Sequence, residues 1–298
     1  MSLPVRNLFS KAIMRMGRMS DLIIGSQGLL GSALSRHLPN AIQGVVMEAK
    51  TKKQRYIDIT KQETIKKAFA ICKPKTVYLA GAITDVDACE ESTGTSVVNV
   101  RGATNVLRAC EKYGSKLVFF STSYVFDGTK GSAYTIDDTP NPIQKYGQQK
   151  LVMEGLISAS EAEYVIIRTV SIFGVERRKR NFAKQILSLV FSGMTAIVPS
   201  DQYVNPIHAD DLAKASVALG NSSAIGIHHV AGDTCLSKYE FAKIIAGHFG
   251  YADSVKPFTE KEHKQVAPRP KMGCLECTVP APSLDNGIQK FLASEFYG

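Results

Sequence analysis

The 298-residue chain contains no tryptophan, and aromatic residues make up only 8% of it. It also has no run of about 18 apolar residues, the length that a membrane-spanning helix needs, so we expect no contact with a membrane. Hydrophobic residues make up 44% and charged residues 21%. This composition is typical of a globular protein, and it excludes collagen, a long coiled coil and a disordered chain.

Acidic residues are fewer than basic ones: the chain has 27 Asp and Glu and 36 Lys and Arg, for a formal net charge of +9. Such an excess suits anionic small molecules as well as nucleic acid. No dense basic helix is present, so we expect no nucleic acid partner. Residues 1–20 hold four of the cations and no acid. They indicate a flexible extension or an organelle-targeting segment. We therefore expect a cytoplasmic protein, with organelle import through residues 1–20 as the alternative.

The cysteines give no pattern of a metal site. Cys72, Cys89 and Cys110 lie in patterns typical of buried or helical positions, which predicts reduced thiols. Cys274 and Cys277 have the spacing of half a zinc site, but no second Cys pair or His pair accompanies them. We expect no bound metal.

Short apolar segments alternate with segments of helical periodicity over the first half of the chain. Strands are predicted at 21–24, 44–47, 76–79, 117–120 and 164–167, and helices at 29–38, 64–72, 97–113 and 145–157. This alternation predicts an α/β fold, a doubly wound parallel sheet of the Rossmann type. After residue 174 the pattern loosens, with helices expected at 182–191, 209–219 and 239–249 and a strand at 227–230.

A glycine turn follows the first predicted strand: Gly25-Ser-Gln-Gly28-Leu-Leu-Gly31. Glycines at such a turn let backbone N–H groups approach a pyrophosphate at the positive end of the next helix. The turn predicts a dinucleotide site formed by Gly25, Gln27, Gly28, Leu29 and Gly31, and a purely structural turn is the alternative. We therefore divide the chain into a basic extension (1–20), an NAD(P)-binding Rossmann domain (21–174) and a smaller, mainly substrate-binding lobe (175–298) with some elements returning to the main sheet.

The segment after the second predicted strand bears on the choice between NAD and NADP. A carboxylate there binds the ribose 2′-hydroxyl of NAD, whereas a cation binds the 2′-phosphate of NADP. Glu48 is followed by four cations in residues 50–55, beginning with Lys50. This balance favours NADP, with NAD as the alternative, and a solvated basic loop would explain the same residues. Asp58, next to Ile59, either accepts a hydrogen bond from the adenine or caps the next helix.

Tyr146 and Lys150 lie four residues apart and share one face of a predicted helix. A nearby cation lowers the pKa of a phenol from its usual value of about 10. The pair can then protonate a carbonyl oxygen while a nicotinamide delivers hydride. Thr122 lies 24 residues upstream, at the end of an apolar strand where ligands bind in open α/β sheets. Tyr239 and Lys243 share the spacing but not this context, so we assign Tyr239 to packing.

Together these motifs resemble the extended short-chain dehydrogenase/reductases. The resemblance rests on the glycine turn, on Asn99-Val-Arg-Gly and on the set of Thr122, Tyr146 and Lys150. Finer matches are similar to the dTDP-4-dehydrorhamnose reductases: Ser121-Thr-Ser-Tyr-Val-Phe-Asp-Gly128, Asn181-Phe-Ala-Lys184, Asp201-Gln-Tyr203 and Ala267-Pro-Arg-Pro270. The similarity extends from about residue 21 to residue 277.

The resemblance implies NAD(P)H-dependent reduction of a 4-keto-6-deoxy sugar nucleotide in nucleotide-sugar or glycan biosynthesis. It implies that Thr122 orients the keto oxygen, that Tyr146 donates the proton, and that Lys150 lowers the phenol pKa and holds the nicotinamide ribose. It also places Ala80, Gly81, Ala82 and Asn99 beside the cofactor, and Tyr124, Val125, Ser171, Asn181 and Arg269 at the substrate. A surface loop arginine is the alternative for Arg269.

Three departures from that family concern the sugar pocket. Ser123 stands where the family usually has Asp, and Ser171 where it usually has Trp. Val204-Asn-Pro-Ile207 replaces Gly-Ala-Pro-Thr. The loss of an aromatic wall leaves the reaction type better supported than rhamnose itself. Two alternatives stay open: a regulatory protein like the beta subunit of methionine adenosyltransferase, and a sugar-nucleotide epimerase that keeps NAD bound. The sequence also leaves open whether the chain forms a homodimer.

Overall fold

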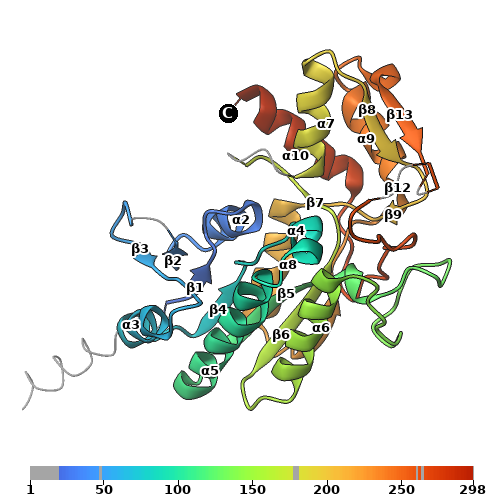
Figure 1. Ribbon diagram of the computed structural model, residues 1–298. Helices are drawn as coiled ribbons and strands as arrows, with labels where there is room; N and C mark the ends of the chain where they lie inside the picture. The colour runs from blue at the N-terminus through green and yellow to red at the C-terminus, as the bar shows by residue number, and fades with distance from the viewer. Residues whose placement is uncertain (1–19, 47–48, 177–180, 260, 263–264, 298) are drawn as a thin grey trace, which may run out of the picture.

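The computed structural model describes residues 20–46, 49–176, 181–259, 261–262 and 265–297 (Figure 1). Residues 1–19, on which the targeting alternative rests, and Glu48 lie outside these ranges. Among the helices of the described part, none is long and apolar enough to cross a membrane.

A parallel sheet forms the centre of the molecule, as predicted. Within the described residues it has seven strands in the order β11–β6–β5–β4–β1–β2–β3. The strands are β1 (Leu22–Ile24), β2 (Ile42–Val45), β3 (Gln54–Tyr56), β4 (Thr76–Leu79), β5 (Lys116–Thr122), β6 (Tyr164–Thr169) and β11 (Gly226–His229). Every pair is parallel. The order reverses on either side of β1, so the predicted doubly wound Rossmann topology is confirmed.

Helices cover both faces of the sheet because successive strand residues point to opposite sides. Phe119 packs in the core under α3 (Gln62–Cys72), α5 (Ala103–Tyr113) and α6 (Lys145–Ser158). Its neighbour Phe120 packs in the opposite core, under α2 (Leu29–His37) and α8 (Ala209–Asn221). In Figure 1, α5 and α6 lie in front of the sheet. A π-helical turn, η1 (Val97–Gly102), precedes α5, so the predicted long helix has two parts.

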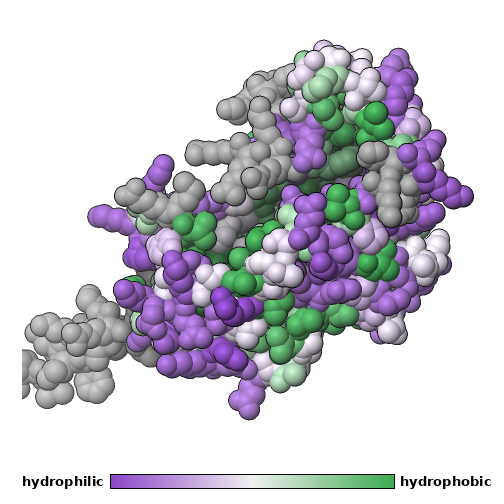
Figure 2. Space-filling view, in the orientation of Figure 1, coloured by the Kyte–Doolittle hydropathy of each residue, from purple (hydrophilic) through white to green (hydrophobic). Residues whose placement is uncertain are grey.

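The C-terminal half builds a smaller lobe with its own core. Phe173, Phe241 and Phe291 pack together between α7 (Phe182–Phe191), α9 (Lys238–Gly247) and α10 (Leu284–Tyr297). Figure 1 shows this lobe at the top, and Figure 2 shows a hollow between it and the sheet domain. The remaining elements are α4 (Val86–Glu91), η2 (Ser123–Val125), β7 (Ile172–Phe173), β8 (Ala196–Pro199), β9 (Tyr203–Val204), β10 (Ile207–His208), β12 (Leu236–Ser237), η3 (Ala252–Ser254) and β13 (Val255–Phe258).

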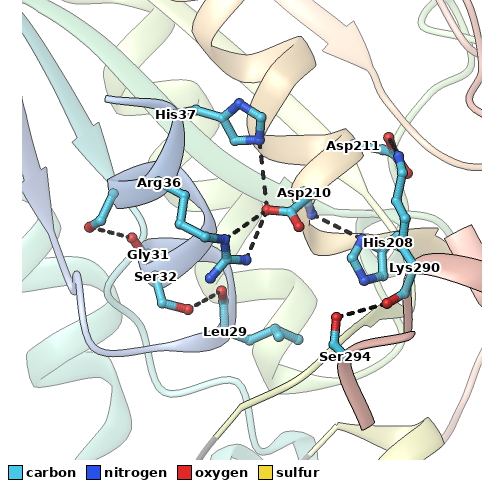
Figure 3. Close-up of polar contacts among 11 residues, drawn as sticks. Leu29, Gly31, Ser32, Arg36, His37, His208, Asp210, Asp211, Lys290 and Ser294 are labelled. Carbon is cyan, nitrogen blue, oxygen red and sulfur yellow. Dashed lines mark hydrogen bonds and ion pairs between the residues drawn. The ribbon is translucent and has the colours of Figure 1, made fainter. Parts of the chain in front are cut away.

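Charged side chains connect the glycine-turn helix to the later part of the chain (Figure 3). Arg36 on α2 pairs with Asp210 at the start of α8 at 2.8 Å. The next acid, Asp211, pairs with Lys290 on α10. His208 caps α8 by accepting the Asp210 N–H at its Nδ1 atom. Helix α8 therefore joins both the main sheet and the smaller lobe.

A disulfide joins Cys235 to Cys274, with 5.9 Å between their Cα atoms. The sequence pattern did not predict this bond. Cys72, Cys89 and Cys110 are buried free cysteines, as expected from their positions. The disulfide links the segment before β12 to the segment that follows Arg269.

We expect reduction of this disulfide to destabilise the protein, because it closes a loop of 39 residues. Loop-closure entropy of this size corresponds to a loss of about 2–4 kcal/mol in the free energy of unfolding. Chemical denaturation with and without dithiothreitol measures the effect. Cys235→Ser is the control, since its stability should not respond to the reductant. A wild-type chain that is equally insensitive would show that the bond does not form.

Candidate active site

The glycine turn lies where the strand order reverses, between β1 and β4. Gly25 has φ +86°, and a Cβ atom on it would lie 2.6 Å from the Gly81 Cα. A Cβ atom on Gly31 would lie 2.1 Å from the Gly25 carbonyl oxygen. Contacts this short are impossible for a real side chain, so packing within the chain requires glycine at both positions.

Gly28 differs because the chain itself leaves room for a side chain there. A Cβ atom on Gly28 would lie 3.5 Å from the Gly25 carbonyl oxygen, an ordinary contact. Gly28 heads α2, whose first turn has no side-chain cap and no acidic residue. A bare helix N-terminus binds anionic groups through its free N–H groups. Gly25, Gly28 and the N-terminus of α2 form a cradle that fits the diphosphate of a dinucleotide cofactor. The diphosphate would approach this cradle from the open side at Gly28.

The residues expected around the cradle are close to it in the structure. Gln27 is exposed beside Gly28, and Leu29 is half-buried at the first position of α2. Ala80, Gly81 and Ala82 follow β4 and are also half-buried. The Ala80 N–H donates to the Ile24 carbonyl, which holds this loop against the end of β1.

The basic segment that follows β2 offers cations for a phosphate group. Lys50 is exposed, and its backbone N–H donates to the Gln54 side chain. Two neighbours are engaged with the backbone: Lys53 donates to the Pro39 carbonyl, and Arg55 to the Lys52 carbonyl. The exposed Lys50 and Lys52 are therefore better placed than Lys53 and Arg55 to meet a phosphate.

Asp58 has hydrogen-bond partners within the chain. Its Oδ1 atom accepts from both the backbone N–H and the hydroxyl of Thr60. The Thr60 hydrogen bond also holds the pKa of the Asp58 carboxyl below its usual value. Asp58 thus fixes the turn before α3, and its contact with the adenine stays a prediction. Ile59 is buried beneath Gly102, where a Cβ atom would lie 2.7 Å from the Ile59 side chain.

Asn99 was expected beside the cofactor, but its side chain is turned into the protein. It exchanges two hydrogen bonds with the backbone of Ile83, each 2.9 Å long. It also donates to Gln149 on α6 at 2.7 Å. Asn99 is 4% exposed. Asn99 thus ties the loop after β4 to the helix that carries Tyr146 and Lys150, and its place beside the cofactor stays a prediction.

Tyr146 and Lys150 are brought to the end of β5 by a close contact between backbones. A Cβ atom on Gly147 would lie 2.0 Å from the Tyr124 carbonyl oxygen, so only glycine allows this approach. The Gln144 side chain caps α6 by accepting the Gly147 N–H, and it donates to the same Tyr124 carbonyl. The rings of Tyr124 and Tyr146 meet edge to face, with centroids 6.5 Å apart.

Thr122 stands at the same point. It is the last residue of β5, and its Oγ1 atom accepts the Tyr124 N–H at 3.2 Å. Lys150 reaches the same strand, because its Nζ atom donates to the Phe120 carbonyl at 2.7 Å. The three side chains predicted to be catalytic are therefore held around the end of one strand by local contacts.

Burial determines the protonation of this set. It raises the pKa of Tyr146 and lowers the pKa of Lys150 to about 8. Lys150 Nζ lies 5.9 Å from the centre of the Tyr146 ring and bonds to a backbone carbonyl. Burial thus dominates the Tyr146 pKa in this geometry, and a lowering of that pKa by Lys150 stays a prediction. The phenol is neutral near pH 7 and can act as a proton donor.

The residues expected at the substrate do not all face an open pocket. Tyr124 is half-exposed beside Tyr146. Val125 is fully buried, in a core with Phe126 and Leu275, and its contact with substrate stays a prediction. Ser171, at the position of the missing Trp, has φ +45°, a left-handed conformation that is costly for residues other than glycine.

Asn181 and Arg269 have partners within the chain. Asn181 caps α7 by accepting the Lys184 N–H, and it donates to the Gly174 carbonyl. Arg269 is one-tenth exposed, pairs with Asp87 at 3.0 Å and donates to the Ala267 carbonyl. Arg269 is thus neither a free surface arginine nor an open anion site, and contact of either residue with substrate stays a prediction.

Sequence reasoning missed the residues that position the catalytic set. Gln144 and Gly147 create the contact between α6 and η2, although Gly147 lies inside the Tyr146–Lys150 motif itself. Glu154 follows Lys150 by four residues, a helical spacing that indicates the same face. Its partner Arg168 has no comparable signal, because the pairing of β6 with β5 brings it there.

The parallel sheet, the glycine cradle and the buried Tyr-Lys pair beside Thr122 define an extended short-chain dehydrogenase/reductase. A family model described as the RmlD substrate binding domain matches residues 19–290. The chain belongs to this family.

Relatives of known name agree with this membership. The chain is 32% identical over 255 residues to the spore coat polysaccharide biosynthesis protein SpsK of Bacillus subtilis, covering 85% of this chain and 88% of that protein. It is 29% identical to a dTDP-4-dehydrorhamnose reductase from Bacillus anthracis solved in complex with NADP, with a TM-score of 0.82 over 93% and 99% of the two chains. It is also 26% identical over 269 residues to methionine adenosyltransferase 2 subunit beta of Xenopus tropicalis, covering 86% and 80%.

We expect Gly147→Ala to destabilise the protein, since the added methyl group would collide with the Tyr124 carbonyl. Overpacking of this kind costs about 1–3 kcal/mol in the free energy of unfolding. The matched control is Gly155→Ala in the same helix, where a Cβ atom meets nothing within 4 Å. That change should stabilise α6 by about 0.5–1 kcal/mol. Denaturant unfolding compares the two, and equal effects would contradict the close contact.

Proposed function

We propose that this protein is an NAD(P)H-dependent reductase that converts the keto group of a 4-keto-6-deoxy sugar nucleotide into a hydroxyl. The observation that carries the proposal is the placement of Tyr146 and Lys150, buried on one face of α6 beside Thr122. These residues lie at the carboxyl end of the parallel strands, the same end as the cradle around Gly28. The match to a dTDP-4-dehydrorhamnose reductase over nearly its full length supports the same reaction.

Each side chain has a distinct part in this reaction. Thr122 directs its hydroxyl at the keto oxygen and orients it, while the neutral Tyr146 phenol donates the proton that the oxygen needs. Lys150 holds the nicotinamide ribose beside the phenol. When bound, the reduced nicotinamide supplies the hydride. Because Tyr146 and Lys150 are buried, their hydrogen bonds act with little competition from water.

We propose NADPH as the preferred reductant, with NADH as the alternative. Exposed Lys50 supports the preference, because a cation near the adenosine ribose would bind the 2′-phosphate. The Bacillus anthracis relative was solved with NADP. The cofactor is assigned to residues 21–174 and the sugar nucleotide mainly to residues 175–298, so the hollow between them in Figure 2 is the proposed site of reaction.

The identity of the sugar is a separate question. Ser171 replaces the expected aromatic wall, and Ser123, which is fully buried, replaces an expected Asp. The smaller side chains favour a substrate that differs from the rhamnose precursor around the sugar ring. Screening dTDP-, UDP- and GDP-linked 4-keto sugars with NADPH and NADH identifies the substrate.

A regulatory role is the second candidate, because the chain resembles a methionine adenosyltransferase beta subunit over 86% of its length. The changes at Ser123 and Ser171 would suit a protein that no longer turns over a sugar. Co-purification with a synthetase, together with no reduction of any 4-keto sugar, would favour this role. An epimerase is a third candidate, and it would run without net consumption of NAD(P)H.

Replacing the proton donor should separate chemistry from binding. We expect Tyr146→Phe to lower turnover of the 4-keto sugar nucleotide by at least about 100-fold, the usual contribution of an acid–base group. NADPH affinity, measured by fluorescence titration, should stay near that of the wild type. A variant that retains full turnover would refute the role of Tyr146.

The open side of the cradle gives a test of cofactor binding. Gly28→Ala should fold as well as the wild type, because the added Cβ atom meets the chain at an ordinary distance. It should weaken NADPH binding by about 10-fold or more, since the methyl group occupies the approach of the diphosphate. Gly155→Ala, also sterically open but on α6, is the control and should bind normally. An unchanged Kd for Gly28→Ala would show that the diphosphate lies elsewhere.

A further inference from the structure

A buried ion pair lies on the helix face that carries the catalytic residues. Glu154 on α6 and Arg168 on β6 each have side chains that are only 3% exposed. Arg168 Nη2 donates to Glu154 Oε2 at 2.7 Å, and its Nε atom lies 3.1 Å from Oε1. Glu154 follows Lys150 by four residues, so the two side chains share one helical face.

The same carboxylate also binds the strand that carries Thr122. The Ser121 hydroxyl donates to Glu154 Oε1 at 2.5 Å. Ser121 and Arg168 are partners in the register of β5 with β6. Glu154 on α6 therefore connects this helix to both β5 and β6, next to Thr122.

Three consecutive residues at the end of β5 thus contact or belong to the site. The Phe120 carbonyl accepts from Lys150, the Ser121 hydroxyl donates to Glu154, and Thr122 faces the site. Although loss of one partner of a buried ion pair is strongly destabilising, apolar residues of similar size often replace a whole pair without loss of stability. Because the network of Glu154, Arg168 and Ser121 lies next to the reacting groups, we ask whether it positions them.

We propose that Glu154 is a positioning residue for the reaction: held by Arg168 and Ser121, it fixes the turn of α6 that carries Lys150 against the end of β5 that carries Thr122. The proposal rests on the reductase function proposed above. It assigns no contact with substrate or cofactor to Glu154.

The charge of Glu154 also acts on Lys150. Burial lowers the pKa of Lys150 to about 8, and Glu154 opposes this effect. Cys89 on α4 and Tyr146 on α6 also face Lys150, and burial raises the pKa of both.

On the far side of the carboxylate, Arg168 faces His229 on β11, and burial lowers the pKa of that imidazole to about 4. Near pH 8 these thiol, phenol and imidazole groups are neutral. Removal of the Glu154 charge should therefore shift the titration of Lys150 to lower pH.

The test is Glu154→Gln, with the exposed Glu161→Gln as the control for loss of one acid. We expect kcat to fall by about 10-fold while KM changes little, since positioning acts on the chemical step. The alkaline limb of the rate profile should move to lower pH by at least about half a unit. Glu161→Gln should match the wild type in all three readouts. Wild-type kcat and an unmoved alkaline limb in Glu154→Gln would overturn the proposal.

A second readout does not depend on turnover. In protein labelled with 13C-lysine, the Cε resonance of Lys150, assigned with Lys150→Arg, reports its titration midpoint. The midpoint should be lower in Glu154→Gln than in the wild type, and an equal midpoint would count against the proposal. If the wild type reduces no keto sugar, the proposed function fails, and this titration still decides the effect of Glu154.

Should Glu154→Gln fail to fold, Ser121→Ala provides the test, since it removes one hydrogen bond and leaves the ion pair intact. We expect its kcat to fall by about threefold with little change in KM or Tm. A Ser121→Ala enzyme with wild-type kcat would then overturn the proposal.

Discussion

The first turn of α6 touches the chain just beyond the end of β5, and the catalytic arrangement depends on this contact. It is possible only because Gly147 has no side chain to collide with the Tyr124 carbonyl. Gln144 closes the contact by capping the helix and bonding to the same carbonyl. Tyr146 and Lys150 are then carried to Thr122 by the helix itself.

The same packing also shields the reacting groups from water. A buried phenol stays neutral, which suits a group that must give a proton to a keto oxygen. A buried ammonium is harder to keep charged, and the pKa of Lys150 falls to about 8. The Phe120 carbonyl and the Glu154 carboxylate offset part of that cost. Position and protonation in this site are therefore set by the same few contacts.

The fold could be predicted from the sequence because the signals were local. Alternating apolar and helical segments marked the strands of the first half, and the spacing of Gly25, Gly28 and Gly31 marked the turn at the switch point. Helix α10 was missed, although Leu284, Ile288 and Phe291 have helical spacing and are buried. Helix α4 is six residues long and has too few positions to show a period.

The site was harder to predict because contacts between distant segments determine it. Sequence spacing brought Tyr146 and Lys150 together but did not show that both side chains are buried. Asp58, Asn99 and Arg269 have polar side chains typical of ligand contacts, yet each has partners within the chain. Val125 is adjacent to Tyr124 in sequence, but the strand end turns it into a core. Such distinctions depend on which segments pack together, and no local pattern records that.

The most direct test of the account follows a labelled hydride. NADPH carrying deuterium at the transferable C4 position is incubated with the protein and a 4-keto-6-deoxy sugar nucleotide, and the product is analysed by mass spectrometry and NMR. The account predicts one deuterium at the sugar C4 atom for each NADP⁺ formed. Product without the label, or label that stays entirely in the cofactor, would contradict hydride transfer to the keto group.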